Sequence, residues 1–119
     1  MIILIGESGS GKTSILNELL KNGYRDNDVF IQRDLNIQET RDRAQEQGID
    51  TIKCFYIFVP AEERTKRMLT RGDSFESIQR IMEMENDKLK NAKEVADFVI
   101  ENKVLEDAVE EIMRLDKGE

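Results

Sequence analysis

The sequence predicts an α/β fold of three layers, in which a short, four-stranded parallel sheet is covered by helices on both faces. Short apolar segments alternate with segments of helical periodicity, in the order β-α-β-α-β-α-α-β-α. Alternation of this kind, joined by right-handed crossovers, produces a parallel sheet between two layers of helices. The chain of 119 residues is long enough for one such domain and little more, so residues 1–119 are expected to form a single domain.

The first strand is expected at residues 2–5, where isoleucine and leucine form a short apolar run. A glycine-rich segment follows, and residues 14–22 then carry apolar side chains at helical spacing. Asn22 and Gly23 are typical of a helix end, because both residue types tolerate the left-handed backbone of a C-terminal cap. The chain therefore opens with a strand, a glycine-rich segment and a helix, in that order.

The later elements follow from the same signals. Further strands are expected at 29–31, 51–59 and 95–100, and further helices at 36–47, in a hairpin at about 64–90, and from 104 to the C-terminus. The run 51–59 is the most apolar of the chain. Continuous apolar runs are typical of parallel strands buried on both faces, so this strand is expected in the interior of the sheet.

The glycine-rich segment fits a phosphate-binding pattern. Residues 6–13 match G-x-x-x-x-G-K-[ST], and they lie between a strand and a helix as that pattern requires. Glycines let the backbone curl so that its N–H groups point inward, and with the N-terminus of the next helix these groups form an anion site. The residues expected to bind phosphate are Ser8, Gly9, Ser10, Gly11, Lys12, Thr13 and Ser14. The alternative is a chance match in a glycine-rich turn.

Two side chains of this segment are predicted to act on a triphosphate. Lys12 supplies a positive charge that reaches the outer phosphates, and the Thr13 hydroxyl is placed to bind Mg²⁺. Lys12 is expected to face solvent when the site is empty, so its replacement should leave the fold intact. The pattern predicts that a triphosphate is held, but it does not say what becomes of the phosphate.

Asp34 is a candidate for the second acidic group of this site. It follows the strand at 29–31, and the carboxyl ends of parallel strands form the ligand-binding edge of such a sheet. There it could hold Mg²⁺ directly or through water. The alternative is an N-cap for the following helix, a position for which Asn36 competes.

A basic cluster lies in the expected hairpin of an otherwise acidic chain. Its members are Arg64, Arg67, Arg71 and Arg80. Arginines of a mobile lid stabilise the charge of a phosphoryl group in transfer, and we assign this role to Arg71 and Arg80, which lie near the bend. Arg64 and Lys66 are expected on the surface. The alternative for the whole cluster is weak surface pairing with nearby glutamates.

The composition excludes several classes of function. The chain has no histidine, so histidine bases and histidine zinc sites are excluded. Its formal net charge of −7 argues against nucleic acid as the main partner. The longest apolar run is too short to span a membrane, and Met1 leads directly into the first strand without a signal peptide. With a single cysteine, Cys54, a reducing cytoplasmic location is expected.

Three blocks of the chain resemble the guanylate kinase family of P-loop nucleotide kinases. Residues 6–14 are similar to the family's G-P-S-G-x-G-K-[ST]. Residues 55–72, from Phe-Tyr-Ile-Phe-Val-Pro to Arg-Gly, resemble its "FIxPP…RRLxxRG" passage into the lid. Residues 96–109 are similar to "xDYVIVNDDLEKAV", the most specific of the three.

The resemblance implies a P-loop NTPase fold and ATP with Mg²⁺ as cofactors. Carried over by position, it implies phosphate binding by residues 9–14, with Lys12 on the outer phosphates and Mg²⁺ at Thr13. It further implies lid arginines at Arg71 and Arg80. Asn102 would lie near the adenine, and Asp34 near the acceptor or the metal.

One large departure separates the chain from this family. Family members insert a subdomain that holds GMP between the first helix and the second strand, whereas here only residues 23–28 fill that interval. Tyr24 and Arg25 alone could replace a fragment of it. We therefore expect a kinase that transfers the γ-phosphoryl group of ATP to a small acceptor, a nucleotide or a nucleoside, with GMP a poor one.

Other readings of the same residues remain open. The acceptor would lie in the crevice above Asp34, or a second subunit would complete its site in a homodimer. The first alternative function is a nucleotide-binding module without kinase activity that acts through a partner protein. A structural remnant is the third reading, and the intact pair of Lys12 and Thr13 argues against it.

Overall fold

The computed structural model describes residues 1–7, 9–32, 37–49, 51–88 and 92–118. The described elements are β1 (Ile2–Gly6), α1 (Lys12–Lys21), the 3₁₀ turn η1 (Asp26–Asp28), β2 (Val29–Ile31), α2 (Ile37–Glu46), β3 (Lys53–Phe58), α3 (Ala61–Thr70), α4 (Phe75–Lys88), α5 (Ala92–Val95), β4 (Phe98–Glu101) and α6 (Leu105–Asp116). None of the described helices is both long and apolar enough to cross a membrane.

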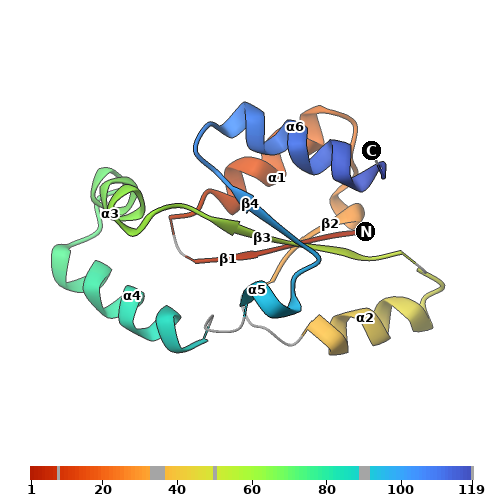
Figure 1. Ribbon diagram of the computed structural model, residues 1–119, viewed down its shortest axis with the longest axis horizontal. Coiled ribbons are helices and arrows are strands. Elements are labelled where there is room, and N and C mark those ends of the chain that lie inside the picture. The colour runs from red at the N-terminus through yellow and green to blue at the C-terminus, as the bar shows by residue number, and fades with distance from the viewer. Residues whose placement is uncertain (8, 33–36, 50, 89–91, 119) are drawn as a thin grey trace.

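The four strands form one parallel sheet, which confirms the predicted α/β class and strand number. The order across the sheet is β2-β1-β3-β4. Ile3 of β1 is in register with Phe30 of β2 and with Cys54 of β3, and Tyr56 of β3 is in register with Val99 of β4. Since all strands run the same way, their carboxyl ends meet at one edge, where α3 also begins (Figure 1).

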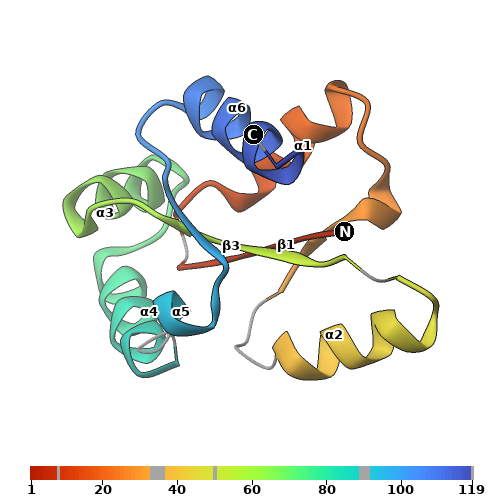
Figure 2. The same cartoon turned by 45° about the vertical axis from the view of Figure 1, so that its right-hand side comes forward.

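Helices α1 and α6 lie side by side on one face of the sheet (Figures 1 and 2). The larger hydrophobic core lies beneath them. It is formed by Ile2, Leu4, Ile15, Leu19, Val29, Phe55, Ile57, Ile100, Ala108, Val109 and Ile112. Phe55 stacks on Phe98 with ring centroids 5.0 Å apart, which joins the interior strand to the edge strand. This face anchors the first helix, whose N-terminus belongs to the candidate site.

Helices α2, α4 and α5 lie on the opposite side of the sheet (Figures 1 and 2). The core cluster on this side is smaller, with Ile3, Ile5, Cys54 and Tyr56 as its buried members. The two edge strands are only partly covered on this side, because Phe30 of β2 is 53% exposed and Val99 of β4 is 42% exposed. The predicted helices on both faces are therefore present, but the two layers are unequal.

The predicted start of the fourth strand is wrong. We expected a strand over 95–100, but α5 ends at Val95 and β4 begins at Phe98. Asp97 explains the late start. Its backbone N–H donates to the Cys54 carbonyl (2.9 Å), and its carboxylate accepts from the Cys54 N–H (2.7 Å). The side chain of Asp97 therefore provides the acceptor that a backbone carbonyl of a paired strand would otherwise provide. The third strand is also shorter than the expected 51–59.

The link between α1 and β2 is as short as the sequence predicts. Tyr24 of this link packs against the larger core, and its hydroxyl donates to Asp116 at the end of α6 (2.9 Å). Burial, followed by the neighbouring Asp116, raises the pKa of Tyr24 to about 12. Tyr24 therefore fastens the link to the helical layer, and neither it nor Arg25 is among the described residues that line the pocket at the site.

Candidate functional site

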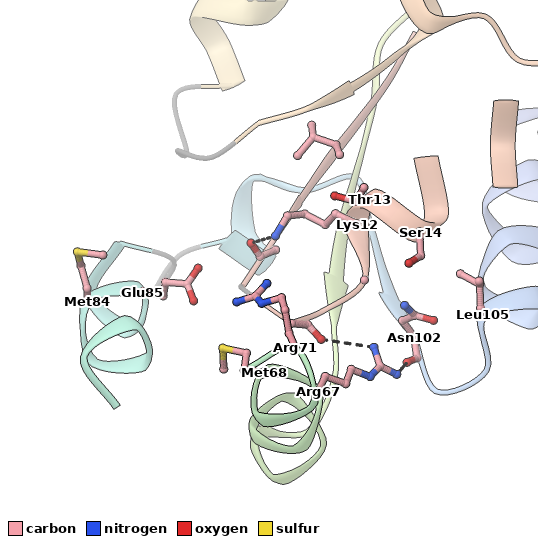
Figure 3. Close-up of a pocket in the computed structure, with 14 residues that line it drawn as sticks. Lys12, Thr13, Ser14, Arg67, Met68, Arg71, Met84, Glu85, Asn102 and Leu105 are labelled. Atoms are coloured by element: carbon pink, nitrogen blue, oxygen red, sulfur yellow. Dashed lines mark hydrogen bonds between the residues drawn. The ribbon is translucent and has the colours of Figure 1, made fainter. Parts of the chain in front are cut away.

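The glycine-rich segment opens into a pocket at the carboxyl edge of the sheet (Figure 3). The cavity volume is about 970 Å³. Its walls come from this segment and the first turn of α1, the end of β2, the helices α3 and α4, and the passage from β4 into α6. The pocket therefore lies where the ligand-binding edge of a parallel sheet is expected.

The described backbone of the loop, residues 6–7 and 9–11, is curled tightly. The Ser10 N–H donates to the Glu7 carbonyl (3.2 Å), and Gly9 and Gly11 have φ values of +80° and +90°. A Cβ on Gly6 would meet the Ile57 carbonyl oxygen, so the first glycine is needed for close packing against β3. Gly11 is the N-cap of α1 and has no side chain with which to cap the first turn. The N–H groups of that turn are therefore available to an anion in the pocket.

Lys12 lies inside this curl. Its ammonium group donates to the carbonyls of Gly6 (2.6 Å) and Glu7 (3.0 Å) and is partly buried. The expectation of a solvent-facing Lys12 is therefore wrong, because the carbonyls of its own loop hold the charge in place. Thr13 and Ser14 line the pocket with exposed side chains in the first turn of α1.

Asn102 holds the loop from the side of β4. It is 2% exposed, and its side-chain amide donates to the Ser10 carbonyl (2.8 Å). Its backbone N–H donates to Phe58 at the end of β3 (2.9 Å). A Cβ on Gly11 would meet this same amide nitrogen. Asn102 thus lines the pocket and also braces the loop, while its contact with an adenine remains a prediction.

Two arginines that line the pocket, Arg67 of α3 and Arg71 at its C-terminal end, point in different directions (Figure 3). The Arg67 guanidinium donates to the carbonyls of Asn102 (2.9 Å) and Gly9 (3.4 Å), so it braces the loop together with Asn102. The Arg71 guanidinium points toward Glu85 of α4 and pairs with Asp73 at 2.5 Å. The hydrogen bond that Arg71 donates to Asp73 raises the pKa of Arg71 above its ordinary value.

Arg80 is not brought to this pocket. Its side chain is exposed on α4 and is not among the described lining residues, so its predicted role in transfer remains untested. Ser8 and Asp34 lie outside the described residues. Among those that are described, no group of three or more acidic or cysteine side chains is arranged to hold a metal ion.

Arg64 is buried, which corrects its predicted place on the surface. It is 6% exposed and pairs with Glu7 of the loop at 2.5 Å and with Glu85 at 3.9 Å. The Tyr56 hydroxyl also donates to Glu7 (3.0 Å), and burial, then Glu7, raises the pKa of Tyr56 to about 12. We call Glu7, Tyr56, Arg64 and Glu85 the Glu7 cluster. It joins the loop to the sheet and to both helices of the hairpin.

Glu85 and Met84 are pocket residues that the sequence analysis missed. The Glu85 side chain is 16% exposed, which is low for a carboxylate on a helix. A signal was present, because Ile78, Met82 and Glu85 follow each other at helical spacing and share the inner face of α4. An acidic residue on an apolar stripe indicates a partner or a function, and here it reaches both Arg64 and the pocket.

Comparisons with known proteins found structures of similar fold. No family model matches the chain, and no curated protein matches its sequence. The structure is similar to the crystal structure of TT1252 from Thermus thermophilus, with a TM-score of 0.69 and 16% identity over 98% of this chain and 95% of that one. It is also similar to an uncharacterized protein from Eubacterium ventriosum, with a TM-score of 0.65 and 13% identity over 100% and 99% of the two chains. At these identities the likeness extends to the fold alone.

Proposed function

We propose that this protein is a P-loop kinase, with a P-loop NTPase fold, that transfers the γ-phosphoryl group of ATP to a small acceptor. The carrying observation is the curl of residues 6–7 and 9–11 between β1 and α1, with the Lys12 ammonium inside it and a large pocket in front of it. A sheet edge, a helix N-terminus and a held cation converge there, and this combination suits a polyphosphate.

The residues present also fit Mg²⁺. This ion keeps several waters and takes oxygen ligands from one or two side chains and from the phosphates. The exposed Thr13 hydroxyl stands at the start of α1, beside the N–H groups that would hold those phosphates. Bound Mg²⁺ would neutralise charge on the transferred group. Asp34 is the sequence's candidate for the second ligand.

The protein's own residues would contribute position and charge. Lys12 would move its hydrogen bonds from the Gly6 and Glu7 carbonyls to phosphate oxygens, a short displacement because the ammonium is already in the curl. Arg71 would turn from Asp73 toward the group in transfer. Groups fixed before the reaction stabilise developing charge most effectively, because little reorganisation is needed. Arg67 and Asn102 would keep the loop in shape.

Thermal unfolding with ligands tests the donor site. A ligand at about 100 times its dissociation constant stabilises the folded state by about 2.7 kcal/mol, which corresponds to a rise in Tm on the order of 10 °C for a domain of this size. We expect ATP–Mg²⁺ and ADP to raise Tm in this way, with GTP–Mg²⁺ and buffer as comparisons. The absence of any shift at millimolar nucleotide would reject the proposal.

The second candidate is a nucleotide-binding module without kinase activity that acts through a partner protein. The short link at 23–28 favours it, since that link, tied down by Tyr24, cannot enclose a second nucleotide. ADP release, measured with nucleosides and with nucleoside monophosphates as acceptors, separates the two candidates. ADP release that depends on an acceptor supports the kinase, and nucleotide binding without it supports the module. We expect GMP to be a poor acceptor.

A further inference from the structure

The pocket has a second wall, away from the side where Asn102 braces the loop. Because the sheet order is β2-β1-β3-β4, Ile31 at the end of β2 and Asn102 after β4 lie on opposite sides of the loop that follows β1. Met84 and Glu85 of α4 likewise face Asn102 across the pocket (Figure 3). At about 970 Å³ the cavity is near the upper end of ligand pockets, so it has room beyond a triphosphate.

Glu85 provides the charge of this second wall. Its carboxylate and the Arg71 guanidinium point toward each other across the pocket (Figure 3). The hydrogen bond that Arg71 donates to Asp73 is the main cause of the raised pKa of Arg71, and the charge of Glu85 adds to the rise, which agrees with this closeness. The Arg64 guanidinium pairs with the same carboxylate, with 3.9 Å between the Arg64 nitrogen and the Glu85 oxygen.

The other described residues of the second wall are apolar. Ile31 is partly buried, and Met84 is 51% exposed. A thioether packs favourably against an aromatic ring, so these side chains suit a planar base. The cations among the described lining residues lie elsewhere: Lys12 begins α1, Arg67 lies on α3, and Arg71 directly follows α3. The described part of the second wall is thus a carboxylate between apolar groups.

These features discriminate between two classes of acceptor. A nucleoside monophosphate would bring a phosphate dianion toward the carboxylate of Glu85, and like charges at close range in a pocket repel strongly. A nucleoside would instead bring an uncharged hydroxyl, which donates a hydrogen bond to a carboxylate, and a base that fits the apolar side chains.

We infer that the acceptor is a nucleoside and that Glu85 binds its hydroxyl, an inference that rests on the proposed kinase function. In the transfer, the hydroxyl oxygen forms a bond to the γ-phosphorus as the bond from that phosphorus to the bridging oxygen of ATP breaks. The hydroxyl proton passes to the Glu85 carboxylate, and ADP leaves with the electron pair of the broken bond. The products are a nucleoside monophosphate and ADP.

The test compares acceptors in pairs on the full chain. ADP release is measured with adenosine, guanosine, cytidine, uridine and thymidine, and with the 5′-monophosphate of each, at fixed ATP–Mg²⁺. We expect at least one nucleoside to exceed its own monophosphate by about 100-fold in kcat/KM, the scale of a general base and a charge-selective contact. If the monophosphates are the better acceptors, or if no nucleoside is phosphorylated, the inference is overturned.

Glu85→Gln, with Glu83→Gln as its control, tests the residue. Both variants make the same chemical change on α4, but Glu83 is exposed and is not among the described residues that line this pocket. We expect Glu85→Gln to lower kcat for the nucleoside by about 100-fold, with ATP binding unchanged. The ratio of kcat/KM for the nucleoside to kcat/KM for its monophosphate should fall as well. Glu83→Gln should change neither. Equal activity in the two variants would refute the role of Glu85.

ATP binding, measured separately by the Tm shift, distinguishes the two levels of failure. If ATP–Mg²⁺ does not bind, the proposed function itself is wrong. If ATP–Mg²⁺ binds and the acceptor preference is reversed, the kinase function stands and only the nucleoside inference falls. The acceptor panel uses the unaltered protein, so it decides the question even if Glu85→Gln fails to fold.

Discussion

Gly11 is the residue at which the loop, α1 and the β4–α6 passage come closest together. Its φ of +90° is unfavourable for any residue with a Cβ, and that Cβ would also meet the Asn102 side-chain nitrogen. Gly11→Ala should therefore lower the free energy of unfolding by about 2–3 kcal/mol, combining backbone strain with the loss of the Asn102 hydrogen bond. Nucleotide-induced stabilisation should disappear with it. Urea unfolding with and without ATP–Mg²⁺ measures both effects.

Gly48→Ala is the matched control for that substitution. Gly48 has a similar φ of +82°, but nothing lies within 4 Å of its added Cβ. It should therefore show the backbone strain alone, about 1 kcal/mol, and keep the response to ATP. Equal losses of stability in the two variants would show that the contact with Asn102 is unimportant.

Lys12 combines a small structural role with the proposed binding role. Lys12→Ala removes the donor to the Gly6 and Glu7 carbonyls, so we expect a loss of about 1 kcal/mol in unfolding free energy. The Tm shift with ATP–Mg²⁺ should vanish, because the charge on the outer phosphates is gone. Lys66→Ala, an exposed lysine on α3, should retain the full shift. An undiminished shift in Lys12→Ala would contradict the assigned phosphate contact.

Residues whose geometry is set locally could be predicted from the sequence, and those set by distant partners could not. The loop glycines and Lys12 follow one another in the chain, so their spacing alone predicts the curl. The burial of Arg64 depends on Glu7, which is far away in sequence and adjacent only after folding. Glu85 was missed for the same reason, because its partner Arg64 is distant in sequence, although its position on the apolar stripe of α4 indicated a special role.

At the scale of elements, the Glu7 cluster connects the loop with β3, α3 and α4. Arg64 is its centre, and its side chain is 7% exposed. Arg64→Ala would leave Glu7 partly buried without its cation, and breaking such a pair typically costs about 3 kcal/mol. Arg80→Ala removes the same charge from an exposed position on α4 and should change stability by less than about 0.5 kcal/mol. Chemical unfolding measures the loss of unfolding free energy in both variants. Similar losses would show that the Glu7 cluster does not stabilise the connection between these elements.

Element boundaries were harder to predict than element types. The segment 95–100 is apolar except for Asp97, yet α5 ends at Val95 and β4 begins only at Phe98. The reason is the paired hydrogen bonds between Asp97 and Cys54, which depend on the neighbouring strand and leave no trace in local composition. Arg41 of α2 binds the same carboxylate at 2.8 Å, so Asp97 also links α2 to the sheet.

At the scale of the whole molecule, the two faces of the sheet differ in how firmly they are covered. Among the described residues, the face under α1 and α6 carries the larger core cluster, and the smaller cluster of the opposite face includes Cys54 and Tyr56. Alternation in the sequence predicts both layers of helices, but it does not predict how much apolar surface each layer buries. The smaller face is also where titratable groups are buried without charge.

Alkaline pH should therefore destabilise the protein through this face. Burial, with Asp97 adding to it and Arg41 opposing it, raises the pKa of Cys54 from 9.0 to about 12. The unfolded chain loses this proton above pH 9 while the folded chain keeps it, so the contribution is complete below pH 9 and is lost as pH rises toward 12. The slope approaches about 1.4 kcal/mol per pH unit for one group.

Tyr56, and Tyr24 on the opposite face, add further losses of stability that begin about one pH unit higher. The ordinary pKa of both tyrosines is 10.0 and burial raises it to about 12, so Cys54 makes the largest contribution between pH 9 and 10. Urea midpoints at a series of pH values should fall in this interval for the unaltered protein, and Cys54 should account for about 1 kcal/mol of the lost unfolding free energy. Cys54→Ala should be less stable at pH 7 and should lose less stability than the unaltered protein from pH 9 to 10, because only the two tyrosines then contribute. Parallel curves for the two proteins would mean that the thiol ionises as readily in the folded state as in the unfolded one.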